Sequence, residues 1–179
     1  MSSILKVDEI QNTDGKTGLV ITPDGSIDGI KFPEEANPSG RTITGTTMSS
    51  YEEGEWTPVW LGSTSNPTVS YFTQEGRYVK IGSFVYVKLR LDITSSSGGN
   101  GVLLIGGLPF DATNDGGALG VASLGYKNAF VNQGPDYGRV IFNHIELYNG
   151  DGASEVRLTP SNLGSNTQCI FTAVYDTTE

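Results

Sequence analysis

The stretch that decides the fold runs from residue 77 to residue 93 and reads Arg-Tyr-Val-Lys-Ile-Gly-Ser-Phe-Val-Tyr-Val-Lys-Leu-Arg-Leu-Asp-Ile. In its second half, apolar side chains take every other position, namely Val85, Val87, Leu89, Leu91 and Ile93. The residues expected on the opposite face are Phe84, Tyr86, Lys88, Arg90 and Asp92. This period of two predicts a long antiparallel strand with one buried face. Gly82-Ser83 predicts a two-residue hairpin that joins it to a strand over Arg77–Ile81.

Further strand candidates follow the same pattern and are separated by clusters of Gly, Asn, Asp and Pro. They are Val69–Thr73, Val102–Ile105, Leu119–Gly125, Arg139–Tyr148, Glu155–Leu158 and Gln168–Tyr175. No window favours a helix of three turns. Strands at this spacing predict an all-β protein, with an antiparallel β-sandwich or jelly-roll-like domain and a barrel as the alternative.

The composition changes near residue 50, because residues 51–179 hold nearly all the aromatic side chains. We therefore predict a small β-rich N-terminal segment over 1–32, a polar linker over 33–50 and a single β-sandwich head over 51–179. Within the first segment, strands are expected at Leu19–Thr22 and Ser26–Phe32, joined by a turn at Pro23-Asp24-Gly25. Residues 4–10 fit either a strand or a helical face.

Charge and composition exclude several classes of protein. The 179 residues carry a net charge of -9, which argues against a nucleic-acid-binding surface. No apolar run is long enough for a membrane helix, so membrane insertion is not expected, and the start lacks the pattern of a secretory signal. One His and one Cys give no disulfide and no zinc site of the usual type within one chain. No cofactor is predicted.

No catalytic residue is predicted. His144 lies in an apolar strand pattern without a nucleophile motif, so a structural histidine is the favoured interpretation. The carboxylates, which a glycoside hydrolase would use in pairs, fall mostly in turns and strand edges. Asp24–Gly29 and Asn149–Gly152 look like fragments of calcium loops, but they lack the alternating ligands and are interpreted as turns. No metal site is expected.

Aromatic residues are the candidate ligand-binding residues. Trp60, Tyr126, Tyr137 and Tyr148 lie beside polar residues, an arrangement that suits stacking against a sugar ring. For Trp56 we favour a place in the core. For Trp60 both a core place and a sugar contact stay open, and the three tyrosines fit a sugar contact and ordinary amphipathic surface equally well.

Five strings resemble tailed-phage proteins. Residues 51–58, Tyr-Glu-Glu-Gly-Glu-Trp-Thr-Pro, resemble a string that opens the C-terminal domain of many phage fibre and appendage proteins, although Glu55 stands where Thr is usual. Gly76–Gly82 and Ile105–Phe110 are similar to the hairpin and the Gly-Leu-Pro-Phe signature of that family. Leu5–Asn12 resembles the opening of fibre-like proteins of cyanophages and other marine phages, and Ile30–Pro33 is similar to the link between the two parts of such proteins.

The resemblance implies a non-enzymatic virion protein on the tail or capsid surface. It also implies a homotrimer. As a hypothesis, the N-terminal segment docks on other virion proteins or forms a stalk, and takes part in trimerisation. A short tail fibre or receptor-binding appendage that contacts host-surface polysaccharide is the first expectation. The alternatives are a structural capsid decoration or tail adaptor protein and, with less support, a glycan-degrading tailspike. The shared strings look architectural, so they bring no catalytic residue with them.

Overall fold

A computed structural model of the chain describes residues 9–11, 17–21, 27–31, 47–48, 50–113, 120–150 and 155–178. The chain divides into two compact units, Met1–Tyr51 and Glu52–Glu179. We call them the N-terminal unit and the head unit and describe each by itself. Across the described residues, no helix has the length and apolar character needed to cross a membrane.

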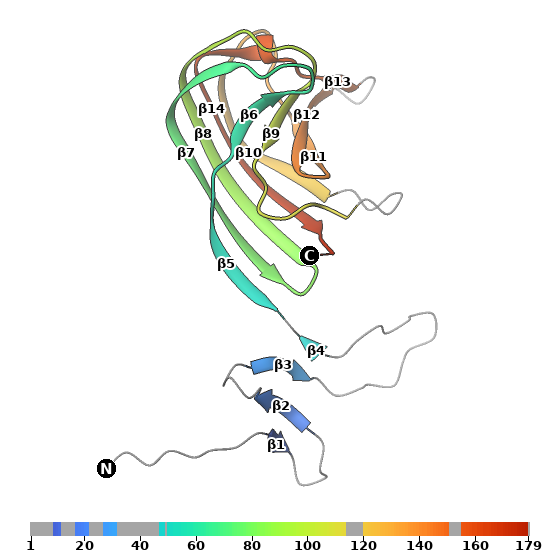
Figure 1. Cartoon of the computed structure of the whole chain (residues 1–179). Helices are drawn as coiled ribbons and strands as arrows, with labels where there is room; N and C mark the ends of the chain where they lie inside the picture. The colour runs from blue at the N-terminus through green and yellow to red at the C-terminus, as the bar shows by residue number, and fades with distance from the viewer. Residues whose placement is uncertain are drawn as a thin grey trace, which may run out of the picture. The chain divides into compact units, whose positions relative to one another are not determined.

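The N-terminal unit contains a four-stranded antiparallel sheet in the order β1-β2-β3-β4 (Figure 1). The strands are β1 (Glu9–Gln11), β2 (Thr17–Ile21), β3 (Ile27–Lys31) and β4 (Thr47–Met48). The two strands predicted here are confirmed as β2 and β3. Ile10 lies in a strand rather than a helix, and the linker residues Thr47–Met48 pair with β3. The predicted turn at residues 23–25 and most of the predicted linker lie outside the described residues.

The head unit is built on one continuous antiparallel sheet. Its strands are β5 (Tyr51–Trp56), β6 (Val59–Gly62), β7 (Thr68–Ile81), β8 (Phe84–Ser97), β9 (Leu103–Gly106), β10 (Gly120–Phe130), β11 (Tyr137–Ile141), β12 (His144–Gly150), β13 (Glu155–Arg157) and β14 (Leu163–Asp176). The order is β5-β7-β8-β14-β10-β11-β12-β9-β6, and β13 pairs with β12. A short 3-10 turn over Pro160–Asn162 precedes β14. The predicted all-β class is confirmed.

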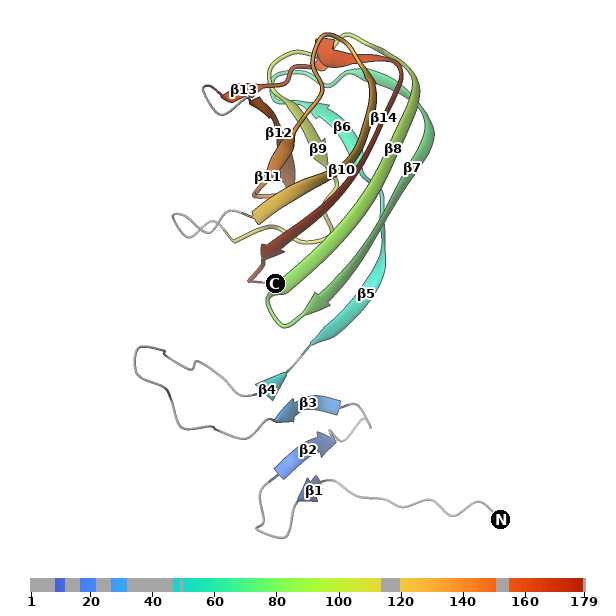
Figure 2. The same cartoon turned by 180° about the vertical axis from the view of Figure 1, so that it is seen from behind.

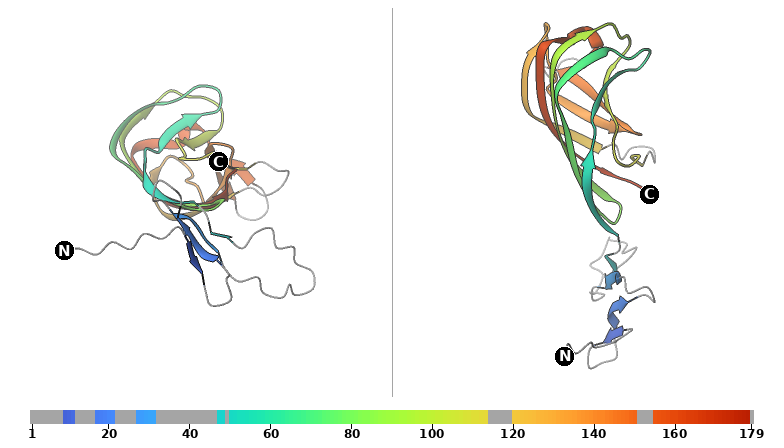
Figure 3. Two further views of the ribbon diagram at one scale, coloured as in Figure 1. Left: turned by 60° about the horizontal axis from the view of Figure 1, so that its bottom comes forward. Right: turned by 60° about the vertical axis from the view of Figure 1, so that its left-hand side comes forward.

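The sheet curls so that two parts of it face each other across a shared core (Figures 1 and 2). The long strands β7, β8, β14 and β10 form one part, which we call the long layer, and β11, β12, β9 and β6 form the short layer. The curl brings the two sheet edges together, as seen in Figure 3. There, the Trp60 amide donates to the Tyr71 hydroxyl at 2.8 Å, and the Gln74 amide nitrogen donates to the Pro58 carbonyl at 3.0 Å.

The predicted hairpin between β7 and β8 is confirmed. Ile81 pairs with Phe84, and Gly82 takes a positive φ of 59° in the two-residue turn. The alternating apolar residues of β8 are all buried and join the core with Phe171, Val140 and both tryptophans. Burial of this apolar area is the main source of stability for the fold.

Asp92 departs from the predicted pattern, because it is only 2% exposed although it was expected on the outer face. The pairing of β7 with β8 is irregular between Tyr71 and Thr73, opposite this point. The Arg90 guanidinium donates to the buried carboxylate, with Nη2 at 2.7 Å and Nε at 2.9 Å from Oδ2. A buried carboxylate requires such a charged partner.

The single strand predicted over Arg139–Tyr148 is wrong. The structure has two strands there, β11 and β12, joined by a hairpin at Phe142-Asn143. Phe142 has a positive φ of 51°, a conformation that apolar residues with a Cβ rarely take, and the sequence therefore carried a weak turn signal. Conversely, the two candidates at residues 69–73 and 77–81 belong to the single strand β7.

Candidate functional site

Three of the phage-like strings, far apart in the sequence, contact one another in the head unit. The Tyr78 hydroxyl donates a hydrogen bond to the Glu52 carboxylate. The Tyr78 ring packs edge-on against Phe110, with centroids 5.4 Å apart and an interplanar angle of 84°. The Lys80 ammonium lies 5.2 Å from the Phe110 ring centroid. These strings therefore fix β5 and the loop after β9 against β7.

Two glycines in these strings leave room for aromatic rings. A Cβ on Gly54 would lie 2.8 Å from the Tyr78 ring, and one on Gly76 would lie 2.5 Å from Trp56 Nε1. Both distances are far shorter than van der Waals contact, so a larger residue would displace the ring. Gly54 thus makes room for Tyr78, and Gly76 makes room for Trp56, which is 8% exposed and forms part of the core, as predicted.

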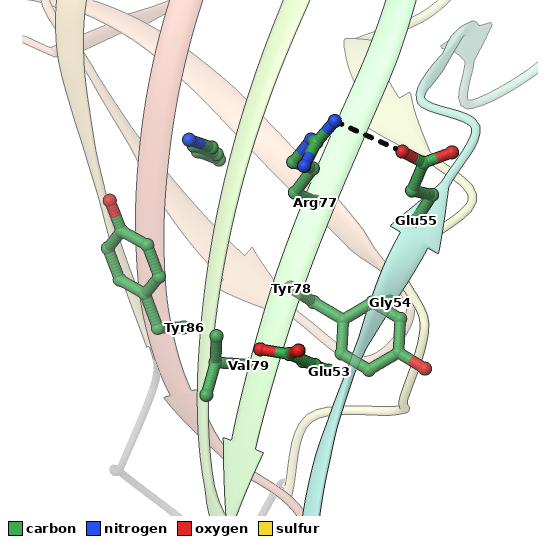
Figure 4. Close-up of a pocket in the computed structure, with 8 residues that line it drawn as sticks. Glu53, Gly54, Glu55, Arg77, Tyr78, Val79 and Tyr86 are labelled. Atoms are coloured by element: carbon green, nitrogen blue, oxygen red, sulfur yellow. Dashed lines mark ion pairs between the residues drawn. The ribbon is translucent and has the colours of Figure 1, made fainter.

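A shallow groove lies beside this cluster, where β5, β7 and β8 run side by side (Figure 4). Its volume is about 370 Å³, and its lining includes Glu53, Arg77, Tyr86 and Lys88. Arg77 reaches across to Glu55, with nitrogen and oxygen 3.2 Å apart. Both side chains are well exposed, so solvent screens this ion pair and leaves the two groups accessible.

Trp60, one of the predicted ligand-binding residues, lies in the core. It is 2% exposed, and its ring packs edge-on against Phe130 with centroids 6.3 Å apart. A sugar cannot reach the ring faces, so a stacking role for Trp60 is excluded in this structure. Its burial follows from the position of β6 at the seam of the curled sheet, where the strand faces the core.

Tyr137 and Tyr148 are brought together on β11 and β12. Their rings stack nearly parallel, at 7°, with centroids 5.4 Å apart. Arg139 and Arg157 approach the Tyr148 ring, with their guanidinium carbons 4.7 Å and 5.8 Å from its centroid. Tyr148 is therefore 2% exposed, and its ring is already occupied by protein groups. A sugar contact through the face of Tyr148 is excluded for that reason.

We call this group of side chains the Tyr148 cluster; it consists of Tyr137, Arg139, Tyr148 and Arg157. The Tyr148 cluster also forms hydrogen bonds with two carboxylates. Glu155 accepts hydrogen bonds from the Tyr137 hydroxyl at 2.5 Å and from Arg139 at 2.6 Å. The Tyr148 hydroxyl donates to Glu146 at 2.5 Å. The bond from Tyr137, followed by the charge of Arg139, lowers the pKa of Glu155. A general acid in glycoside cleavage needs the opposite shift, so Glu155 is unsuited to that part.

Tyr126 lies apart from the other predicted residues, on the outer face of the long layer. It is 47% exposed and pairs across β10 and β14 with Ile170. Its hydroxyl is 3.5 Å from the Gln168 amide oxygen, a long contact that leaves the group available. The structure thus brings Tyr137 and Tyr148 together, buries Trp60 in the core and leaves Tyr126 on a different surface.

His144 and Cys169 show no catalytic arrangement. Burial lowers the pKa of His144, and its Nδ1 lies 3.3 Å from the neighbouring Asn143 side chain. Cys169 is a free, buried thiol on β14 whose pKa is raised by burial, which keeps it protonated and unreactive. In the described part of the chain, no three His, Cys, Asp or Glu side chains group in a way that could hold a metal ion.

The groove residues were missed as site candidates, although part of the signal was in the sequence. The predicted Gly82-Ser83 turn fixes the register of the hairpin, and that register already places Arg77 opposite Lys88. The alternation of faces along each strand does not by itself show this pairing. The contributions of β5 and β14 depend on long-range pairing, which the hairpin does not determine.

The comparisons with known proteins concern the fold. No family model and no curated protein matches the sequence. Among solved structures, the crystal structure of the Dettilon tailspike protein (gp208) is similar, with a TM-score of 0.56 and 19% identical residues. The match covers 70% of this chain but 24% of the tailspike chain, so this protein spans about a quarter of that length. At this identity, the similarity shows that the two chains share an all-β fold.

Proposed function

We propose that this protein is a phage virion appendage, a short tail fibre or receptor-binding protein that contacts glycan on the host surface. The observation that carries the proposal is the all-β fold, which a tailspike protein shares over 70% of this chain. The phage-like strings at residues 51–58, 76–82 and 105–110 support it, because they meet in one structural cluster.

The proposed role is binding, without a catalytic step. The carboxylates bound to the Tyr148 cluster, Glu146 and Glu155, are each held by a tyrosine hydroxyl. Such groups stabilise the surface on which they lie and are poorly placed to exchange protons with a substrate. Of the residues first proposed as sugar contacts, Tyr126 and the outer part of Tyr137 keep that role in the proposal.

We further propose that three chains associate and that the N-terminal unit docks on another virion protein. Its strands contain three, five, five and two residues. Sheets of such short strands bury little apolar area within one chain, and copies from three chains packed around an axis would bury more. Light scattering of the full-length protein tests this association, with a mass of three chains as the expected result and a monomer as the contrary one.

The location on the particle tests the proposed function. We expect gold-labelled antibodies against the head unit to mark the tail of the virion and to block adsorption to host cells. Virions lacking residues 1–50 of the protein should lose the label. Labelling spread over the head would instead indicate a capsid decoration protein. Release of reducing ends from host polysaccharide would contradict the non-enzymatic assignment.

A further inference from the structure

Three basic side chains gather on the outer face of the long layer. Arg77 on β7 pairs directly with Lys88 on β8, and Arg90 follows on the same face of β8. A hollow of about 230 Å³ lies among these three residues and is also lined by Glu75 and Ile170. We call it the basic hollow. Its positive groups stand out because the chain as a whole carries a net charge of -9.

The arrangement is unfavourable for the protein alone, since like charges on directly opposite strand residues repel each other. Carboxylates compensate two of the three cations. Arg77 contacts Glu55, and Arg90 contacts Asp92 at 2.7 Å. Among the ion pairs of the described residues, none involves Lys88. The Lys88 ammonium is therefore the group with charge left for a ligand.

Two exposed tyrosines flank the basic hollow. Tyr86 precedes Lys88 by two positions on the same face of β8 and is 38% exposed. On the other side, Tyr126 pairs across the sheet with Ile170, which lines the hollow. Aromatic rings pack against the apolar faces of sugars, and charged side chains bind sugar substituents. The hollow and the two tyrosines beside it therefore present both kinds of group on one surface.

We propose that the basic hollow binds a saccharide unit that carries a carboxylate. Lys88 binds the carboxylate, with Arg77 directly opposite it on β7. Glu75 accepts hydrogen bonds from hydroxyls, and Tyr86 or Tyr126 packs against the ring. The inference rests on the proposed glycan-binding role and names its site and its chemistry. The net charge of -9 repels long polyanions, so the fitting ligand is a glycan in which acidic units are separated by neutral ones.

A matched pair of probes tests the proposal. Methyl glucuronide and methyl glucoside differ in one group, a carboxylate against a hydroxymethyl. Titration of the full-length protein, followed by the amide NMR signals of β7 and β8, should show about tenfold tighter binding of the glucuronide. Lys88→Gln should remove this preference, and added salt should weaken it. The control Arg157→Gln makes the same change of charge on β13 and should leave the preference intact.

Several outcomes would overturn the proposal. Equal affinity for the two probes, no binding of either, or a preference that survives Lys88→Gln would each reject the basic hollow as a carboxylate site. If Lys88→Gln instead changes the mass of the assembly in light scattering, the hollow is a contact between copies. These results are separate from the proposed function, which the position of the protein on the particle decides.

Discussion

The Tyr148 cluster and the basic hollow are built from the same kinds of side chain, but they use them in opposite ways. In the Tyr148 cluster, each tyrosine hydroxyl meets a carboxylate, and Arg139 covers the Tyr148 ring at 4.7 Å. In the basic hollow, Arg77 faces Lys88, and Tyr86 remains exposed. Tyrosine and arginine content therefore does not by itself mark a binding surface. What marks it is whether these groups have already satisfied one another.

Removing the buried ring of Tyr148 should lower the stability of the protein more than any other change considered below. Tyr148→Ala should lower the free energy of unfolding by about 4 kcal/mol, because it removes a fully packed aromatic side chain. Tyr126→Ala, on the other surface, should change it by less than about 0.5 kcal/mol. Urea denaturation of both variants measures the difference. Similar losses for the two would contradict the contrast between a closed cluster and an open surface.

The stability of the protein should also be sensitive to substitution of Gly76, where β7 packs against the Trp56 ring. Gly76→Ala should lower the free energy of unfolding by about 2 kcal/mol, since its Cβ would overlap the indole ring. Gly125→Ala is the matched control, because a Cβ there would find its nearest neighbours at 3.6 Å and 3.7 Å. That variant should be neutral or slightly stabilising. Equal stability of the two variants would show that the ring can move aside.

The short layer carries backbone strain at the hairpin between β11 and β12. Phe142→Asn should raise the free energy of unfolding by about 0.5 kcal/mol, because Asn tolerates the positive φ better than Phe does. Phe142→Ala removes the same ring without this benefit and serves as the control. Thermal denaturation should rank Asn above Ala, and the reverse order would show that the ring, not the backbone, decides.

The smallest expected effect is a pH dependence of the Tyr148 cluster. The pKa of Glu155 is lowered in the folded protein, first by the hydrogen bond from Tyr137. Its contribution to stability is therefore present above the ordinary pKa of 4.5 and is lost as the pH falls through the lower, folded value. Melting temperatures measured from pH 6 down to pH 3 should fall less in Glu155→Gln than in the wild type.

Tyr137→Phe should reduce this acid dependence in the same way, because it removes the same hydrogen bond from the other side. An unchanged pH profile in both variants would show that the bond does not persist in solution. It would also weaken the view that the Tyr148 cluster is closed.

The sequence was most informative where structure depends on neighbours along the chain. The alternation over residues 84–93 and the Gly82-Ser83 turn predicted the hairpin, its register and its buried face, because local geometry determines all three. The Phe142-Asn143 turn was missed, since its backbone is held by surrounding contacts. One of these is the hydrogen bond from the Ala112 amide to the Phe142 carbonyl.

The candidate site was less predictable for a related reason. Tyr148 looked like an exposed tyrosine at the end of a strand, and its burial depends on Arg157, which reaches it through the separate strand β13. Trp60 is buried because β6 closes the curl of the sheet, a consequence of pairings that span the whole domain. Such long-range strand pairings depend on the packing of the whole core, so no short stretch of the sequence predicts them.

The position of β5 also determines how the head unit bears mechanical load. The chain enters the head unit through β5, an edge strand that pairs within its sheet with β7. A pull on residues before Tyr51 therefore acts first on β5. Along β5, this tension meets the Glu52–Tyr78 hydrogen bond, the Glu55–Arg77 ion pair and the Trp56 ring, which packs over Gly76. The phage-like strings thus lie where tension on the chain would first separate β5 from β7, and their side-chain contacts oppose that separation.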